Sequence, residues 1–545
     1  MFQQTLNPAG NLWLTVLIAM VPFIALLYML AALRLTAWLA TIIGGLLTML
    51  LGVLVWHAPA GDTLKSYLYG GFTGFWAIDW ITFWGLIIFN TLVLTGMFER
   101  FKKWMIHHAT ADIRIQTIML AWAFGALLEG LVGFGYPWAV VVPILVGLGI
   151  ADLDAIRVAA LANNAPVSYG ALGAPILGLA AVTGLPMMAL SASVGSIVAI
   201  LALLPPWVLI YLVSGWDGMI EAWPLAIVGS LSYIAGQWPV ARYLGPYIPD
   251  LSGAMVSFWT LFLFVKVWHP KKIRAFGGVP LASAEKSLAS NPSEPRLEAR
   301  LEVGSVREAL SVWLPYLVLI AVVVSWTNPK SPLPGISWLR WSVAANSSVT
   351  QRPILSVFNF TPFAGGTSIL VSWVVLLLIL RPQWQIIPQV FSKTFKQMWG
   401  ALLVAFFIFA LAYIFVFTGM ANSLAYGLSK IGVFFVVLAP ILGWIGVALS
   451  GSNTATNAMF GPVQMLTGRL LNLPILLLPS FNSVGAEVGK PIAPQTASVG
   501  VSTSKLVRSE GQVIRHNMGW TLVVLAYLIV ISAIFYLFLS KWMSL

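Results

Sequence analysis

The stretch GVALSGSNTATNAMFGPVQ, residues 446–464, decides how the rest of the chain is interpreted. Strongly apolar sequence surrounds it, yet it contains a run of hydroxyl and amide side chains: Ser450, Ser452, Asn453, Thr454, Thr456 and Asn457. Such side chains compete for backbone hydrogen bonds, so the run favours a break in a helix. Because unpaired polar groups are costly in a bilayer, we predict a helix that ends inside the membrane and faces a cavity, as in transporter sites. The alternative is a helix–helix contact of small residues, which is common in membranes.

The composition places the chain in a lipid bilayer. Of its 545 residues, 59% are hydrophobic and only 8% are charged, a balance that soluble domains do not show. A span needs about 20 apolar residues, and the chain offers about a dozen such runs. We therefore predict an all-α polytopic membrane protein. The net charge of +12 falls mostly in a few loops, as the positive-inside rule expects, so it does not indicate nucleic-acid binding.

Two further observations limit the chemistry and the topology. The chain has no Cys, which excludes disulfides and thiolate metal sites. It has no HExxH, Walker or GxSxG motif, which argues against an ATP-driven pump and a membrane protease. Residues 1–11 contain no Lys or Arg, so we expect no cleavable signal peptide and an N-terminus outside the cell.

Apolar runs define the expected helices. Uninterrupted runs predict spans near residues 12–33, 35–56, 75–97, 187–213, 223–240, 253–268, 309–326, 365–381, 395–417, 432–448 and 517–540. Residues 57–74 and 327–364 are polar, and we expect loops outside the cell there. Residues 269–308 contain seven Lys and Arg, which predicts a cytoplasmic linker. The predicted domains are a first membrane repeat (1–268, with extra helices at 187–268), the linker (269–308) and a second membrane repeat (309–545).

Short motifs of the first half recur in the same order in the second half. They pair Thr95-Gly96-Met97 with Thr418-Gly419-Met420, Leu128-Glu129-Gly130 with Leu449-Ser450-Gly451, and Asn163, Gly170 and Pro175 with Asn482, Gly489 and Pro494. The separations are 323, 321 and 319 residues, and a smooth drift of this kind is expected for a duplicated unit. The alternative is chance similarity between apolar sequences rich in Gly and Pro.

Loop charges give the two halves opposite orientations. The loop after the first Thr-Gly-Met, residues 98–114, is basic and therefore cytoplasmic, whereas the loop after the second contains only Lys430. Residues 177–186 have no Lys or Arg, whereas their counterparts around 502–516 have three. Broken or re-entrant helices are expected at residues 123–149, 163–176, 446–464 and 482–495. Inverted-topology repeats with paired broken helices are typical of secondary transporters, whose substrate site lies where the repeats meet.

Glu129 and Lys490 are the charged candidates inside the broken segments. An acid within a membrane segment is costly and is by default a functional hypothesis, and a buried carboxyl suits proton coupling. Alternatively, Glu129 caps a half-helix or pairs with a buried cation. Lys490 can pair with a substrate carboxylate, or with Glu129 or Glu487 when the site is empty. Glu487 precedes Lys490 by three residues, so a local pair on one helix face is an equal alternative.

Uncharged residues of the broken segments complete the candidate binding site. The proposed donors and acceptors are Asn163, Asn164, Ser168, Ser450, Ser452, Asn453, Thr454, Asn457, Asn482 and Gln495. Free N–H groups at half-helix N-termini favour an anion, so this set suits a carboxylate and a hydroxyl group. Because they lack side chains, Gly130, Gly133 and Gly135 allow the backbone to approach the substrate closely. The alternative is that these glycines only allow helices to pack closely, which is common in membranes.

Other acids receive structural interpretations. Asp79 lies near the outer end of the third predicted helix, and we interpret it as an interfacial or gating acid, with ion coupling as the alternative. Asp217, Glu221 and Asp250 are interpreted as loop or helix-end residues.

Several segments resemble the signature segments of the L-lactate permease family. They are NPAGNLWL (7–14), GALLEGLVGFGYPWAV (125–140), NNAPVSYGALGAPI (163–176), LGPYIPD (244–250), GWIGVALSGSNTATNAMF (443–460) and NSVGAEVGKPIAPQ (482–495). The resemblance implies a proton symporter for lactate, glycolate and other small 2-hydroxy monocarboxylates in a prokaryotic plasma (inner) membrane. It also implies membership of the ion-transporter superfamily, whose Ser-Asn-Thr motif resembles residues 452–454. Relatives there work as elevators, usually as dimers, so the resemblance implies an elevator-type homodimer.

The main functional hypothesis is therefore uptake of lactate-like anions, with Glu129 carrying the coupling proton and no cofactor. One alternative is a sodium-coupled carboxylate transporter, with Asn453 and nearby carbonyl groups as Na⁺ ligands. A passive anion channel is another. A membrane enzyme acting on lipid is disfavoured because no nucleophile–base pair or metal set is visible.

Overall fold

The computed structural model describes residues 1–107, 110–133, 135–281, 306–328 and 330–544. Within these ranges, nine helices are long and apolar enough to cross a membrane, and one pair of helices bent by 66° is a tenth candidate. The structure thus confirms a polytopic, mostly helical membrane protein. It adds one small β-sheet that the sequence analysis missed.

The first helices follow the apolar runs, but the third begins earlier than predicted. The first two are α1 (Leu12–Ala31) and α2 (Ala37–Leu54). The predicted polar loop at 57–74 is wrong, because α3 (Ala60–Thr73), the π-helical η1 (Gly74–Asp79) and α4 (Trp80–Leu94) continue into one another. The side of this helix that carries glycine packs closely against α18 (Ile386–Phe417). A Cβ at Gly74 would lie only 2.5 Å from the Ala405 carbonyl oxygen of α18. Close packing against α18 therefore stabilises a helix that its hydropathy does not predict.

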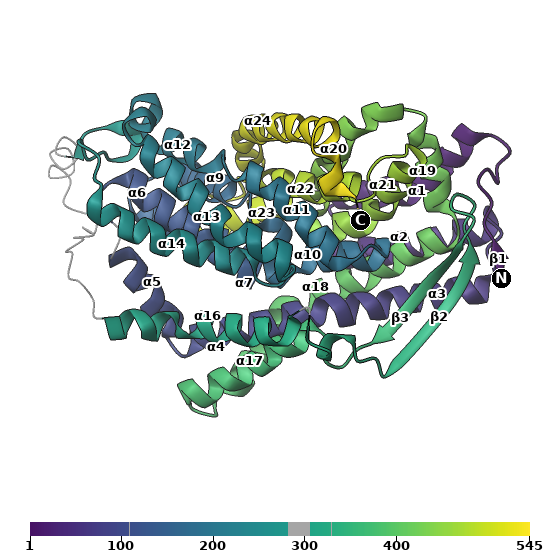
Figure 1. The fold of residues 1–545 in the computed structure, drawn as a ribbon, viewed down its shortest axis with the longest axis horizontal. Helices are drawn as coiled ribbons and strands as arrows, with labels where there is room; N and C mark the ends of the chain where they lie inside the picture. Colours follow the sequence, from purple (N-terminus) through teal and green to yellow (C-terminus); the bar gives the residue numbers. More distant parts are fainter. Residues whose placement is uncertain (108–109, 134, 282–305, 329, 545) are drawn as a thin grey trace.

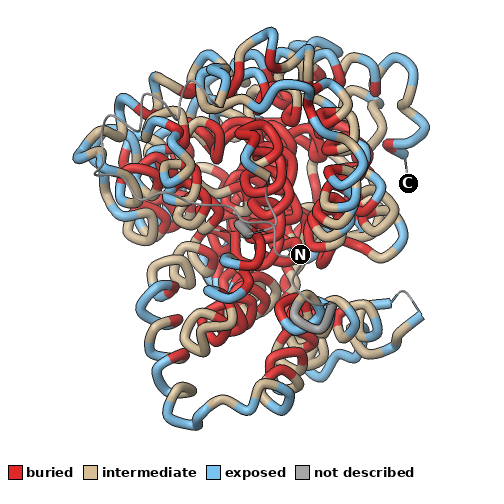
Figure 2. The backbone as a smooth tube through the Cα atoms, turned by 90° about the vertical axis from the view of Figure 1, so that its left-hand side faces the viewer, coloured by how far each residue is buried: buried red, intermediate tan, exposed pale blue. Residues whose placement is uncertain are grey.

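The helices form two groups of unequal size. Figure 1 shows α4, α18, α16 (Val306–Thr327) and α17 (Gly365–Leu380) along the lower side, with most of the other helices above them. Figure 2, turned by 90°, shows a larger group whose centre is buried and a smaller group beneath it. The larger group contains both sets of broken helices. It includes the apolar helices α11 (Met187–Leu201), α12 (Pro205–Glu221), α13 (Trp223–Tyr243), α14 (Pro249–Val267) and α24 (Glu510–Leu537).

The segment predicted as a polar loop at 327–364 contains a β-hairpin. Strand β2 (Leu339–Asn346) pairs antiparallel with β3 (Pro353–Phe360), with Leu339 opposite Phe360, and β1 (Phe2–Gln3) joins β2 in parallel. Alternation of apolar and polar residues at the start of β2, Leu-Arg-Trp-Ser-Val at 339–343, is the signal for a strand. The hydroxyl groups of Ser66 on α3 and Ser356 on β3 are 2.8 Å apart. The hairpin is thereby fixed to the helical bundle.

All predicted breaks fall in broken helices. In the first half, α7 (Phe124–Leu131) and α8 (Tyr136–Gly147) form a helical hairpin, followed by the bent pair α9 (Asp152–Ala162) and α10 (Gly170–Thr183) with η3 (Val167–Tyr169) between them. In the second half, α20 (Phe435–Ser450) and α21 (Asn453–Leu470) form a hairpin, followed by α22 (Leu477–Gly489), η7 (Lys490–Ile492) and α23 (Pro494–Ser502). Gly451 at the second hairpin turn has φ +73°, a conformation that glycine adopts without strain.

The two Thr-Gly-Met motifs have the same local structure. Gly96 and Gly419 are both left-handed, and the next residue starts α5 (Met97–His107) and α19 (Met420–Ser429), respectively. The hydroxyl groups of Thr95 and Thr418 each donate to the carbonyl oxygen four residues earlier, at 2.8 Å. This similarity agrees with the duplication inferred from sequence.

The beginning of the predicted linker packs onto the bundle. Arg114 of α6 (Ile113–Thr117) is fully buried and lies 2.6 Å from Asp112, and Arg274 of the linker lies 2.8 Å from Glu221. Arg114 also donates to the Lys272 carbonyl oxygen. Residues 269–281 are therefore anchored, whereas most of the predicted linker, residues 282–305, lies outside the described residues.

Candidate functional site

The centre of the site is an ion pair between the two halves of the chain. Glu129 lies in the last turn of α7, and its Oε1 atom is 2.7 Å from Nζ of Lys490 in η7. The other oxygen, Oε2, accepts a hydrogen bond of 3.0 Å from the Asn163 amide. Glu129 is 1% exposed and Lys490 is 6% exposed. Three predicted site residues from separate segments thus meet in a setting where a charge requires a partner.

Glu487 has a different partner from the one that its spacing suggested. Its Oε1 atom accepts a hydrogen bond from the backbone N–H of Ser168, and within the described residues its Oε2 atom has no hydrogen-bond partner. The local Glu487–Lys490 pair is not among the ion pairs of the described chain, where Lys490 pairs with Glu129. Two buried carboxyl groups therefore approach the same broken segments, but only one has a cation.

Asn457 joins three elements by hydrogen bonds. Its amide nitrogen donates to the Pro175 carbonyl oxygen of α10 at 3.1 Å and to the Ser483 hydroxyl of α22 at 3.0 Å. Its oxygen accepts from the Asn482 amide at 3.0 Å. All the polar atoms of the Asn457 side chain are thus used by the protein itself.

Asn453, in the first turn of α21, is only partly used. Its amide nitrogen donates to the Ser483 carbonyl oxygen at 3.2 Å, and the Ser168 hydroxyl lies 3.5 Å away. Its oxygen has no partner among the described residues. The Ser168 and Ser483 hydroxyl groups are 3.2 Å apart, so Asn453, Ser168 and Ser483 form one small polar group.

Several buried polar atoms of the broken segments lack partners within the described part of the chain. They are Oδ1 of Asn163, Oδ1 and Nδ2 of Asn164, Oδ1 of Asn453 and Oε2 of Glu487. Buried polar groups in proteins are nearly always hydrogen-bonded, and exceptions mark a ligand, water or ion position. These atoms come from both halves. They provide the groups that a small polar ligand needs.

The hairpin tip serves mainly to cap helices. Ser452 accepts a hydrogen bond of 3.2 Å from the Ala455 N–H, which makes it the N-cap of α21, and the Ser450 and Thr456 hydroxyl groups are 3.1 Å apart. Thr454 is partly exposed in the first turn. Ser450 and Ser452 thus have structural partners, although a helix N-terminus is also a site where anions bind.

The glycines and Gln495 lie where the hairpin turns meet the broken helices. A Cβ at Gly451 would touch the Gln495 side chain, which is exposed at the start of α23. A Cβ at Gly133 would lie 3.0 Å from Ala171 of α10, and one at Gly135 would lie 3.5 Å from Val499 of α23. The backbone of Ala171 thus lies close to Gly133, which favours the packing alternative there, whereas the contacts at Gly135 are ordinary side-chain contacts.

Asp250 is the residue that the sequence analysis missed. It lies in the first turn of α14, as predicted, but is fully buried, and its Oδ1 atom accepts a hydrogen bond of 3.0 Å from the Tyr233 hydroxyl. A Cβ at Gly130 would lie 2.7 Å from the Asp250 Cβ, so Asp250 packs directly beside the segment that carries Glu129. Its position among apolar residues after Pro249 was the available signal. Asp79 is 3% exposed, and thus buried rather than interfacial, in η1.

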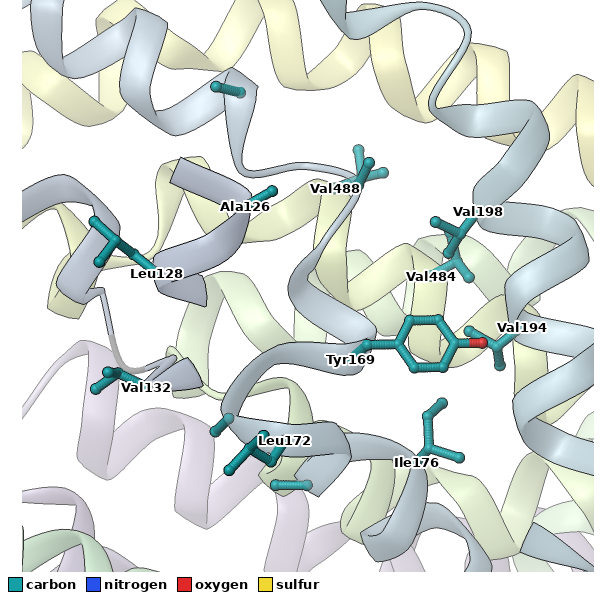
Figure 3. Close-up of a cluster of buried hydrophobic side chains, with 14 of the residues drawn as sticks. Ala126, Leu128, Val132, Tyr169, Leu172, Ile176, Val194, Val198, Val484 and Val488 are labelled. Carbon is teal, nitrogen blue, oxygen red and sulfur yellow. The ribbon is translucent and has the colours of Figure 1, made fainter. Parts of the chain in front are cut away.

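An apolar shell surrounds the polar groups. Figure 3 shows Tyr169 beside the Val194 and Ile176 side chains, with Val484 nearby. The Tyr169 hydroxyl donates to the Ser191 carbonyl oxygen, which fixes η3 against α11. Apolar surroundings strengthen electrostatic interactions between charged groups because little water screens them.

The family model described as L-lactate permease matches residues 15–540. The chain belongs to the L-lactate permease family. It is 32% identical to the glycolate permease GlcA of Escherichia coli over 537 residues, which cover 95% of each chain. It is 31% identical to an L-lactate permease of Bacillus subtilis and 30% identical to one of Salmonella typhimurium, with 96% of each chain covered. These relatives are permeases, so the protein is a transporter rather than an enzyme.

Two solved structures match with low similarity. The Alcanivorax borkumensis YdaH transporter has a TM-score of 0.47 at 15% identity and covers 92% of this chain and 98% of its own. Neisseria gonorrhoeae MtrF has a TM-score of 0.46 at 14% identity, with 94% and 97% covered.

Proposed function

We propose that this permease imports L-lactate, glycolate and other small 2-hydroxy monocarboxylates by proton symport. The names of the relatives support the substrate class. The buried ion pair between Glu129 and Lys490 carries the proposal, because it offers a direct link between anion binding and proton binding.

Anion binding and proton binding are linked because the substrate carboxylate and Glu129 compete for the single ammonium group of Lys490. In the empty site Lys490 is neutralised by Glu129. An incoming carboxylate binds to Lys490 and displaces Glu129, whose carboxylate would then be buried without a cation. An unpaired buried charge is so unfavourable that the group takes up a proton instead. The loaded site then contains Lys490, the substrate anion and a neutral Glu129, so its net charge equals that of the empty site.

The unpartnered polar side chains of the broken segments suit the 2-hydroxyl group and the second carboxylate oxygen of the substrate. The unpartnered Nδ2 of Asn164 can donate to a carboxylate oxygen or to the oxygen of the 2-hydroxyl group, and the unpartnered Oδ1 of Asn453 can accept a hydrogen bond from that hydroxyl group. The N-terminus of α21, capped by Ser452, adds a partial positive charge. A hydroxyl that satisfies a buried donor and acceptor distinguishes a 2-hydroxy acid from an analogue without it, because the analogue leaves them unpaired.

For the transport cycle we propose inverted repeats and an elevator-type movement of the site. A helical hairpin followed by two helices with a short 3₁₀ turn between them occurs in both halves, and the two Thr-Gly-Met motifs share one conformation. A site that keeps its net charge when loaded with a proton and an anion is cheaper to move through a bilayer than a charged one. We place the N-terminus and the β-hairpin outside the cell, on the same face because β1 pairs with β2.

The decisive experiment is uptake of labelled L-lactate into proteoliposomes with an imposed inward proton gradient and no sodium. We expect accumulation above equilibrium that a protonophore abolishes, with glycolate competing. Uptake only with sodium would replace proton coupling by sodium coupling, and currents without accumulation would indicate a channel. Glu129→Gln should abolish uphill uptake while leaving exchange between loaded states. Uphill uptake at the full rate in this variant would exclude Glu129 as the coupling acid.

A further inference from the structure

A separate cavity of about 460 Å³ opens beneath the β-hairpin. Its wall is formed by β3, the C-terminal end of α10 at residues 181–184, Tyr413 of α18, and α21 at residues 462–469. A smaller adjoining hollow of about 300 Å³ shares part of this lining. Segments from both halves of the chain thus meet around one opening.

The charge of the lining has a single sign. Arg352, next to the hairpin turn, and Arg469, at the end of α21, line both hollows, and their linings contain no Asp or Glu. Both side chains are exposed, and neither belongs to an ion pair within the described part of the chain. Two guanidinium groups without an acid partner at one opening attract anions, and a guanidinium binds a carboxylate in a bidentate manner.

Two of the helices that line the cavity, α10 and α21, also contribute residues to the candidate site. Pro175 and Asn457, which are hydrogen-bonded near the site, precede the cavity-lining Ala181 and Pro462 by six and five residues, or about 8–9 Å of helix. Between them the helices touch, since a Cβ at Gly461 would lie 2.6 Å from Leu179. The cavity therefore ends about one and a half helical turns from the Pro175–Asn457 contact, with close packing in between.

We propose that Arg352 and Arg469 form an entrance site that captures the carboxylate of the substrate before it reaches Lys490. This inference rests on the proposed function, because it takes the transported molecule to be a small carboxylate. It also explains why a segment on the proposed outer face carries arginines, which the positive-inside rule disfavours there. The entrance site concentrates the anion at the opening, so it acts on the apparent affinity rather than on the maximal rate.

The first test compares uptake by Arg352→Gln, Arg469→Gln and the double variant with uptake by Arg340→Gln. Arg340 is an exposed residue of the same hairpin, but it pairs with Asn359 at the opposite end of the strands and is not part of the lining. We expect the double variant to raise KM for lactate about tenfold at low ionic strength, within the range of electrostatic steering, with kcat unchanged. Added salt should reduce the difference. Unchanged KM, or an equal rise in Arg340→Gln, would overturn the entrance site.

The second test does not depend on transport. Because the chain has no Cys, Thr350→Cys places a single thiol in the cavity lining. An anionic methanethiosulfonate should modify this thiol faster than a cationic one of similar size, and the ratio of rates should fall when both arginines are replaced by Gln. A ratio that does not change would refute the anion-attracting entrance. Absence of lactate uptake in the unmodified protein, with the ratio as expected, would refute the proposed function alone.

Discussion

The backbone N–H of Ser168 donates a hydrogen bond to the Glu487 carboxyl group across 319 positions of the chain, which is also the separation between the motif residues Asn163 and Asn482. In the duplication that we propose, the contact joins two residues at equivalent positions of the repeated unit. Equivalent positions can touch only near the axis that relates the two units. Ser168 and Glu487 thus mark the place where the broken segments of the two halves meet.

Glu487 should tolerate replacement of its carboxyl group by an amide, but not loss of the oxygen that accepts the hydrogen bond from Ser168. Lys490 is paired with Glu129, so Glu487 has no cation among the described residues and is expected as a neutral acid. Glu487→Gln keeps an acceptor for the Ser168 N–H, and we expect proton-driven uptake to persist. Glu487→Ala leaves that N–H unpaired and should reduce the free energy of unfolding by about 1–3 kcal/mol. Thermal melting and lactate uptake measure both effects. Loss of uphill uptake in Glu487→Gln, with exchange retained, would transfer the coupling role from Glu129 to Glu487.

The Glu129–Lys490 pair should show strong coupling in a double-mutant cycle. Lys490→Gln leaves a buried carboxyl without a cation and should destabilise the protein by about 3–5 kcal/mol, as for other broken buried pairs. Glu129→Gln combined with Lys490→Gln removes both charges, so the melting temperature should recover toward that of the unmodified protein. Lactate binding should not recover, because the ammonium is absent. Independent, additive effects on melting would contradict the ion pair.

Much of the site could be predicted from the sequence because charge and helix breaks are rare in a membrane. Glu129, Asn163 and Lys490 stood out for this reason, and the structure brings them together. The sequence offered Glu129 and Glu487 as alternative partners of Lys490, but it could not choose between them, because Glu129 and Lys490 lie in elements hundreds of residues apart. Spacing alone suggested Glu487 for Lys490, whereas packing of α7 against the broken segments supplies Glu129.

Parts of the fold also could not be predicted from the sequence, because they depend on contacts between distant segments. Hydropathy identified the long spans, but it failed at α3, where polar residues and glycines form a helix because α18 packs closely on them. It failed again at residues 339–360, where the hairpin depends on pairing between strands rather than on hydropathy. Asp250 was placed correctly at a helix start, but its burial depends on contacts with Gly130 and Tyr233 that sequence spacing does not show.

Asn457 and Asn164 should respond differently to removal of the amide. Asn457 uses its amide for three hydrogen bonds within the protein, so Asn457→Ala should lower the free energy of unfolding by about 1–3 kcal/mol. Both polar atoms of the Asn164 side chain lack partners among the described residues, so Asn164→Ala should change the melting temperature little and raise KM for lactate. Melting and uptake kinetics of the two variants provide the comparison. Equal destabilisation by both substitutions would argue against a ligand position at Asn164.

Arg114 should be important for stability and not for substrate specificity. It is fully buried and interacts with Asp112 and with the carbonyl oxygen of Lys272, which anchors residues 269–281. Arg114→Ala leaves the Asp112 carboxylate buried and unpaired, and we expect a loss of about 3–5 kcal/mol in unfolding free energy. The exposed pair of Lys65 and Asp62 is a matched control, and Lys65→Ala should lower the free energy of unfolding far less than Arg114→Ala, because water screens an exposed ion pair. Similar melting temperatures for the two variants would contradict the anchoring role of Arg114.

Gly170 should tolerate a methyl group poorly, because of its position against the ion pair. A Cβ at this position would lie 2.5 Å from Oε1 of Glu129, the oxygen that contacts Lys490. Because the carboxylate is held on both sides by Lys490 and Asn163, it cannot move without breaking one of these contacts. Gly170→Ala should therefore impair lactate uptake strongly, whereas Gly147→Ala, where a Cβ meets open space, should not. The decisive readout is the pH dependence of uptake. A displaced Glu129 should alter the pH profile, whereas simple loss of folded protein should lower uptake equally at every pH.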